Sequence, residues 1–193
     1  MNFVKEVKNL IQSKKRWNIQ RINEDIVKHL QKELHISSAA AKILVAKGIE
    51  TKEEATKIIH SSECLHDPYL LHGMKDAVLR IQQAIENKEK ILVYGDYDAD
   101  GLSSTAVMLT TLRDLGANVD FRIPNRFLHG YGPNEELFQK AFEDGVKLII
   151  TVDNGISGVQ QVKLAKQLGM DIIVTDHHEP PEILPEADVI IHP

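Results

Sequence analysis

Carboxylate and imidazole side chains gather in three short runs in the second half of the chain. These runs are GDYDADG with Asp96, Asp98 and Asp100, TVDNG with Asp153, and TDHH with Asp176, His177 and His178. Carboxylates crowded into one crevice repel one another, and divalent cations relieve that repulsion. Oxygen-rich ligation with one or two imidazoles suits Mn²⁺ or Mg²⁺ better than a thiolate-bound zinc. The three runs therefore predict an Mn²⁺ or Mg²⁺ site, provided that the fold brings them together.

Other interpretations of these runs are weaker. A single Asp after a strand is commonly a helix N-cap or a turn former, but that does not explain three strand ends with paired histidines. DYDADG also matches the start of an EF-hand loop, yet Val107 occupies the twelfth position, where a bidentate Glu is required. A phosphatase with an aspartyl nucleophile also opens with Asp-x-Asp after a strand, but leaves Asp-His-His unexplained. The absence of a glycine-rich loop ending in Lys-Ser/Thr excludes a P-loop NTPase.

The elements that must position these side chains follow from the pattern after residue 90. Short apolar runs alternate with helical segments, the runs being KILVYGD, NVDFRIP, VKLIITVD, DIIVTD and ADVIIHP. Continuous Ile/Leu/Val strands separated by helices indicate a doubly wound α/β fold with a parallel sheet covered on both faces. In such sheets ligands bind beyond the carboxyl ends of the strands, where all three acidic runs are expected.

The first half of the chain has a helical pattern instead. EDIVKHLQKEL has apolar residues on one face, and Thr51 followed by Glu54 predicts a capping box at the start of another helix. DAVLRIQQAIENK is a further amphipathic segment. We therefore predict a small helical N-terminal region over residues 1–89 and an α/β domain over residues 90–193.

Composition restricts the function classes only weakly. The 193 residues carry a net charge of −5. Residues 1–89 hold 15 basic against 12 acidic side chains, a balance of +3, and residues 90–193 hold 8 against 16, a balance of −8. No apolar run approaches the roughly 20 residues that span a bilayer, and early charges argue against a secretion signal. A lone cysteine, Cys64, excludes an internal disulfide, so we expect a cytoplasmic protein without a membrane segment.

The motifs also resemble those of a known family. VYGDYDADG, TVDNG and TDHH stand in the order of motifs I, III and IV of the DHH phosphoesterases, and RIPNRFLHGYG resembles motif II of the RecJ branch of that family. The upstream segments GIETKEEA and HDPYLLHGMKDAVLRI are also similar to that branch, so the resemblance covers roughly residues 36–193.

The resemblance implies a hydrolase that cleaves phosphodiester bonds with two metal ions. The implied activity is a 5′→3′ exonuclease on single-stranded DNA that serves DNA repair and recombination, with a single-strand-binding protein or a helicase as a further partner. The implied Mn²⁺ or Mg²⁺ ligands are Asp98, Asp100, Asp153 and His177. Asp96, Asp176 and His178 are implied to support these ligands or to contact the phosphate, and Asn154, Arg126, His129 and Tyr131 to bind the DNA strand.

The same resemblance leads us to expect a fragment. In this family a later segment of the domain supplies another aspartate, and a substrate-binding domain and an OB-fold follow. We therefore expect the DHH domain of residues 90–193 to be incomplete at its C-terminal end, with impaired activity. Two alternatives stay open: a DHH phosphodiesterase acting on short oligonucleotides or cyclic dinucleotides, and a non-catalytic binding module.

Overall fold

The computed structural model describes residues 21–60 and 66–193, which leaves Cys64 outside the described residues. The chain divides into two compact units, Met1–Leu65 and His66–Pro193. This boundary differs from the one expected at residue 89. The reason is that helix α5 (Met74–Glu86) buries Ala77 and Ala84 against the strands of the second unit, so its amphipathic face belongs to the α/β core.

Within its described residues, 21–60, the first unit contains three helices whose starts are capped by polar side chains. They are α2 (Glu24–Leu34), α3 (Ser38–Ala46) and α4 (Lys52–Ile59). Asn23 and Ser37 cap the first two, and the capping box predicted for Thr51 and Glu54 is confirmed. The helices share a small core, made of Val27, Leu30, Ala41, Val45 and Ala55. None of the helices in the described ranges is both long and apolar enough to cross a membrane.

The second unit is built around a five-stranded parallel sheet of order β2-β1-β3-β4-β5. Its strands are β1 (Lys90–Tyr94), β2 (Asn118–Arg122), β3 (Val146–Val152), β4 (Asp171–Thr175) and β5 (Val189–Ile191). Its other helices are η2 (Pro68–Leu70), α6 (Ala99–Asp114), α7 (Glu135–Glu143) and α8 (Val159–Gln167). The predicted doubly wound α/β fold is confirmed. The strand order reverses between β1 and β3, which makes a topological switch point there.

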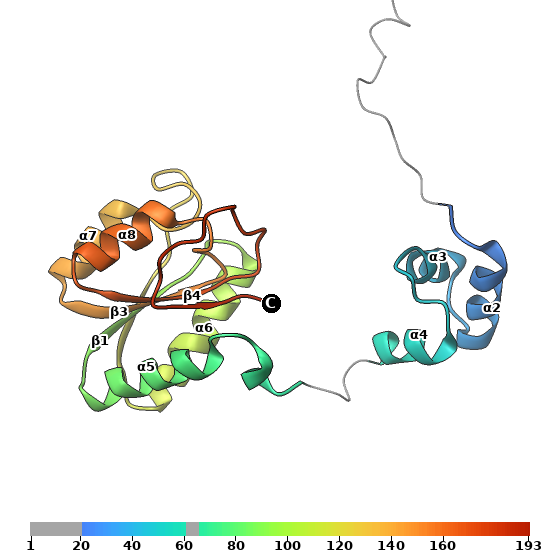
Figure 1. Ribbon diagram of the computed structural model, residues 1–193, viewed down its shortest axis with the longest axis horizontal. Coiled ribbons are helices and arrows are strands. Elements are labelled where there is room, and N and C mark those ends of the chain that lie inside the picture. Colours follow the sequence, from blue (N-terminus) through green and yellow to red (C-terminus); the bar gives the residue numbers. More distant parts are fainter. Residues whose placement is uncertain (1–20, 61–65) are drawn as a thin grey trace, which may run out of the picture. The chain divides into compact units, whose positions relative to one another are not determined.

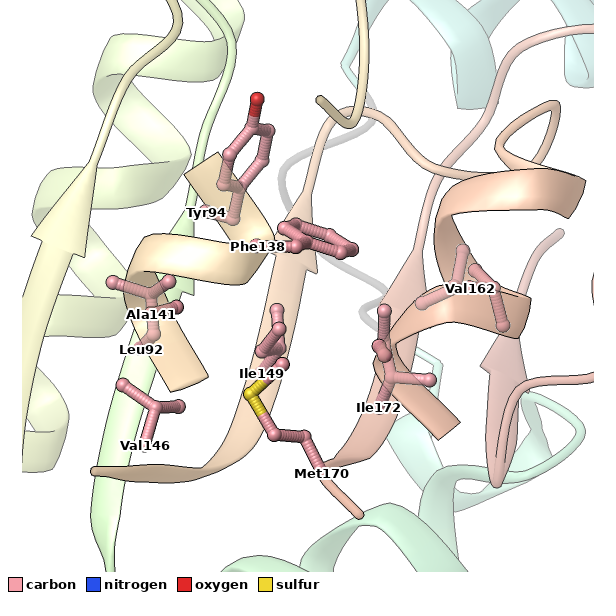
Figure 2. Packing of buried hydrophobic residues seen from close by; sticks show 11 residues of the cluster. Leu92, Tyr94, Phe138, Ala141, Val146, Ile149, Val162, Met170 and Ile172 are labelled. Carbon is pink, nitrogen blue, oxygen red and sulfur yellow. The ribbon is translucent and has the colours of Figure 1, made fainter. Parts of the chain in front are cut away.

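Helices cover both faces of this sheet, with α7 and α8 on one side and α5 and α6 on the other (Figure 1). On the α7/α8 face, Phe138 and Val162 pack over Leu92, Ile149 and Ile172 (Figure 2). The opposite face buries a second cluster, which includes Ile91, Val93, Leu148, Ile150, Ile173 and Leu112. Because neighbouring strand residues point to opposite faces and both faces are covered, the central strands β1, β3 and β4 are mostly apolar and buried, whereas the edge strand β2 is largely exposed.

Candidate metal centre

The three acidic runs meet at the carboxyl edge of the sheet, as the sequence predicted. Asp96 and Asp98 follow β1, Asp153 follows β3 and Asp176 follows β4. A cavity of about 410 Å³ opens at this edge. Its lining residues are Leu71, Asp100, Ser104, Asp153, Thr175, Asp176, His177, Ile191 and Pro193. The site thus lies beside the β1/β3 switch point, where ligands bind in folds of this class.

Two sets of potential ligand atoms converge at this edge and share one residue. Asp153, His177 and His178 form one set, and Asp96, Asp98 and Asp153 form the other. Within each set the ligand atoms lie within 4.8 Å of one another. A carboxylate common to two such sets is suited to hold two adjacent cations, and the mixture of carboxylates and imidazoles fits Mn²⁺ or Mg²⁺.

The electrostatics of the site also fit a bound cation. Asp96 is 1% exposed, and among the described residues no Lys or Arg forms a salt bridge with Asp96, Asp98 or Asp153. Burial raises the pKa of Asp153 above its ordinary value, and the charge of Asp98 adds to that rise, whereas the hydrogen bond from His177 opposes it. A divalent cation at this edge would supply the missing positive charge.

Asp153 adopts an unusual backbone conformation that directs its carboxylate toward the end of β4. Its φ is 63°, in the left-handed region that Asp and Asn adopt more readily than other non-glycine residues. The Nε2 atom of His177 lies 2.8 Å from Oδ1 of Asp153. This contact links the ends of β3 and β4 and places an imidazole beside the shared carboxylate.

Asp176 is buried, and its carboxylate accepts several hydrogen bonds within and beside the TDHH turn. Its Oδ2 accepts the amide of Ile156 at 2.9 Å, and its Oδ1 accepts the amide of His177 at 2.7 Å. The same Oδ1 also lies 2.7 Å from Nδ1 of His178. Burial alone would raise the pKa of Asp176, but these hydrogen bonds outweigh it and lower the pKa below its ordinary value. Oδ1 therefore orients the two histidines, while Oδ2 anchors Asp176 to the backbone of Ile156.

His178 is held from three directions. Besides Asp176, the hydroxyl of Tyr131 lies 3.0 Å from Nδ1 and 3.2 Å from Nε2 of its ring. Nε2 of His192 lies 2.7 Å from the carbonyl oxygen of His178. The hydrogen bond with Asp176 is the main reason that the pKa of His178 rises above its ordinary value. Sequence reasoning missed His192, although its place after the fifth apolar run predicted a position at this edge.

The residues of the DYDADG run take different places. Asp98 caps α6 by accepting the amide of Gly101 at 3.0 Å, so it is a helix cap and a potential ligand at once. Asp100 lines the cavity from the first turn of α6 but belongs to neither ligand set, whereas Asp96 does. The tight β1–α6 turn requires glycine, because a Cβ on Gly101 would lie 2.6 Å from the backbone of Asp96.

The predicted substrate-binding residues separate into two groups. Arg126 lies with its guanidinium 5.4 Å from the ring centroid of Tyr97, and Tyr131 reaches His178, so both border the site. Nδ1 of His129 accepts the amide of Asn125 and shapes the loop. Asn154, which the resemblance implied to bind the strand, is 0% exposed, and its amide donates to the carbonyls of Tyr94 and Val152. The bond to Tyr94 joins the ends of β1 and β3, and the bond to Val152 fixes the turn just after β3.

Comparisons with known proteins agree with this geometry. Residues 90–193 match the family model described as the DHH family, N-terminal domain. The chain is 52% identical over 185 residues to the single-stranded-DNA-specific exonuclease RecJ of Bacillus subtilis, which covers 95% of this chain and 24% of that protein. It is 46% identical over 124 residues to RecJ of Escherichia coli, which covers 64% of this chain and 22% of the relative. The chain thus spans about a quarter of the length of these relatives.

Solved structures of RecJ proteins are also similar to this chain. RecJ of Thermus thermophilus in complex with Mn²⁺ aligns with a TM-score of 0.64 and 28% identity, covering 92% of this chain and 25% of that one. An exonuclease RecJ bound to manganese aligns with a TM-score of 0.60 and 37% identity, covering 64% of this chain and 31% of that one.

Proposed function

The chain belongs to the DHH family, and on that premise we propose that it is the metal-binding part of an exonuclease that hydrolyses phosphodiester bonds of single-stranded DNA in the 5′→3′ direction. The observation that carries the proposal is the pair of ligand sets that share Asp153 at the carboxyl edge of the sheet. The similarity to RecJ proteins, among them manganese-bound ones, supports single-stranded DNA as the substrate.

We assign the metal-binding role to Asp96, Asp98, Asp153 and His177. Asp100 is a less favoured ligand, because its carboxylate lies outside both sets. When bound, Mn²⁺ or Mg²⁺ would activate a water molecule and stabilise the charge on the departing oxygen.

The chain's own groups position the substrate. His178, oriented by Asp176 and contacted by Tyr131, is placed to hydrogen-bond an oxygen of the scissile phosphate. Because the hydrogen bond with Asp176 favours the protonated imidazole, His178 is suited to an anionic partner. Arg126, which lies against Tyr97, provides a positive charge at the same border for the DNA backbone.

A role in DNA repair and recombination follows from this activity. We place the protein in the cytoplasm, and we infer that a helicase or a single-strand-binding protein presents the strand to it. We propose that metal binding and phosphodiester hydrolysis take place in the unit that contains the sheet.

The experiment is hydrolysis of a long single-stranded DNA, labelled at either end, by this chain with Mn²⁺. The reactions include an EDTA control and the variants Asp98→Asn and Asp120→Asn, of which Asp120 is an exposed acid on β2. We expect slow, stepwise, metal-dependent loss of nucleotides from the 5′ end. This loss should be abolished in the Asp98 variant and unchanged in the Asp120 variant. Calorimetric titration with Mn²⁺ gives a second readout, in which only the Asp98 variant should lose affinity.

The alternatives predict different products. A DHH phosphodiesterase for small substrates would cleave dinucleotides or cyclic dinucleotides and leave the long strand intact. A non-catalytic module would bind the strand without cleaving it and would show no Mn²⁺ affinity. Equal activity of the Asp98 variant and the unmodified chain would contradict the assigned site.

A further inference from the structure

The loop between β2 and α7 has a shape of its own. Over residues 125–129, Oδ1 of Asn125 accepts the amides of Phe127 at 2.9 Å and Leu128 at 3.3 Å. The carbonyl oxygen of Asn125 accepts the amide of His129 at 2.8 Å, and Nδ1 of His129 accepts the amide of Asn125 at 2.9 Å. These four hydrogen bonds close a compact turn, so the conformation of its tip does not depend on a ligand.

This loop is attached to the candidate metal centre at both ends. At its start, Arg126 lies over Tyr97, the residue between Asp96 and Asp98. At its end, Tyr131 contacts His178, and the buried hydroxyl of Tyr94 donates to the carbonyl of Gly132 at 3.1 Å. The tip of the loop is therefore held at the border of the edge where the ligand sets lie.

The tip exposes the two most accessible large apolar side chains in the described ranges. Phe127 is 93% exposed and Leu128 is 79% exposed, whereas Tyr94 and Phe138 in the core of the same unit are 0% exposed. An aromatic ring that stays exposed to water contributes no hydrophobic stabilisation to the folded state. Beside a phosphodiester site, such a ring is suited to a flat apolar group that belongs to the same ligand as the phosphate.

We propose that Phe127, flanked by Leu128, is a stacking platform for a nucleobase of the single strand whose backbone lies at the metal centre. The inference rests on the proposed function, because the loop is continuous with that site through Tyr97 and His178. A nucleobase is the favoured occupant because a nucleotide joins a flat π face to the anionic group that the site binds. Every base has such a face, so the platform accepts any sequence.

The test compares two short DNA strands of equal length, one with normal bases and one with abasic sites, in binding to the full chain with Ca²⁺. The variants are Phe127→Ala, Phe127→Tyr and, as a matched control, Leu115→Ala. Leu115 is 61% exposed just after α6, a helix of 16 residues and thus about 24 Å long that begins at the metal centre. Gel analysis verifies that the strands stay intact.

We expect Phe127→Ala to weaken binding of the normal strand by about fivefold to a hundredfold, the effect of losing one stacked base. It should leave binding of the abasic strand unchanged. Phe127→Tyr should retain affinity, and Leu115→Ala should have no effect. A Phe127→Trp variant in a Trp17→Phe background then reports stacking directly, since its only indole emission should be quenched by the normal strand alone.

The outcomes separate the inference from the proposed function. If the unmodified chain binds neither strand, the proposed function fails and the platform with it. If it binds both strands with equal affinity, single-strand binding stands and the platform alone is refuted. If Phe127→Ala weakens binding of the normal and the abasic strand equally, the platform is also refuted. Phe127 would then affect contacts with the DNA backbone and not with a base. Binding of the normal strand by the Phe127→Trp variant without quenching of its emission would also refute the platform, because no base would then stack on the ring.

Discussion

Nε2 of His177 lies 2.8 Å from Oδ1 of Asp153, although 24 residues separate them in the chain. The contact joins the ends of two neighbouring strands, β3 and β4, and it involves the one carboxylate that both ligand sets share. The left-handed conformation of Asp153 makes this possible, because φ of 63° turns the residue just after β3. The choice of residue at position 153 is therefore restricted both by the contact with His177 and by the left-handed backbone conformation.

Two substitutions at this position should separate ligation from backbone strain. Asp153→Asn keeps a residue that tolerates φ of 63°, so we expect unchanged or slightly greater stability without metal and roughly tenfold or more weaker Mn²⁺ binding. Asp153→Ala should weaken Mn²⁺ binding to the same extent. It should also lower the free energy of unfolding by about 1 kcal/mol, because alanine is strained at this φ. Urea unfolding with EDTA and Mn²⁺ calorimetry measure the two effects. Undiminished Mn²⁺ affinity in the Asn variant would disprove the ligand assignment.

Asn154 should affect stability more than ligand binding. Asn154→Ala removes the hydrogen bond that joins the end of β3 to Tyr94 of β1 and the local bond to Val152, and leaves both carbonyls without those donors. We expect a loss of about 1–3 kcal/mol in the free energy of unfolding, measured with urea. Asn118→Ala, at an exposed position on β2, is the control and should change stability by less than about 0.5 kcal/mol. A stable Asn154 variant with weakened DNA binding would restore the substrate-contact interpretation.

The ion-pair cluster at the opposite end of β4 should make stability depend on pH. Burial alone would raise the pKa of Asp171, but the hydrogen bond and charge of Arg80, followed by Lys166, lower it below its ordinary value. Asp171 therefore stabilises the folded state above its unfolded pKa, and this contribution is lost as pH falls through the folded pKa. The cluster also includes Glu89, paired with Arg80, and Asp188, paired with Lys166.

The check is urea unfolding over a pH series from about 7 to about 3. Asp171→Asn should be less stable than the unmodified chain near neutral pH, and the difference should shrink as the solution becomes acidic. Asp120→Asn provides the comparison, since Asp120 forms no salt bridge within the described part of the chain. A difference that stays constant over the whole series would refute the linkage.

The turn between β1 and α6 should be intolerant of added volume. A Cβ at Gly101 would lie 2.6 Å from the backbone of Asp96, so Gly101→Ala must displace either the start of α6 or Asp96 itself. We expect a loss of about 1–3 kcal/mol in stability together with weaker Mn²⁺ binding. Gly116→Ala is the matched control: it has open space but φ of 78°, so only backbone strain should appear and Mn²⁺ binding should persist. Equal Mn²⁺ binding by both variants would contradict this role of Gly101.

The sequence by itself determined the fold class and the edge at which the site lies. Continuous apolar runs alternating with helical segments specify a parallel sheet covered on both faces, and the carboxyl ends of parallel strands necessarily meet at one edge. The positions of Asp96, Asp153 and Asp176 just after such runs were therefore sufficient to predict that they converge. The capping box of Thr51 and Glu54 was predictable for a similar reason, because it is a local interaction.

The tertiary structure alone decided which of those residues join a ligand set. Asp96 belongs to a ligand set, whereas Asp100, in the first turn of α6, lines the cavity without joining either set. Asn154 is buried because β1 and β3 are neighbours at the switch point, an arrangement set by pairing between distant strands. The compact units divide after residue 65 because α5 packs on the sheet, whereas the family model begins at residue 90, as the sequence pattern does. Side-chain direction and burial depend on such long-range contacts, which spacing along the chain does not specify.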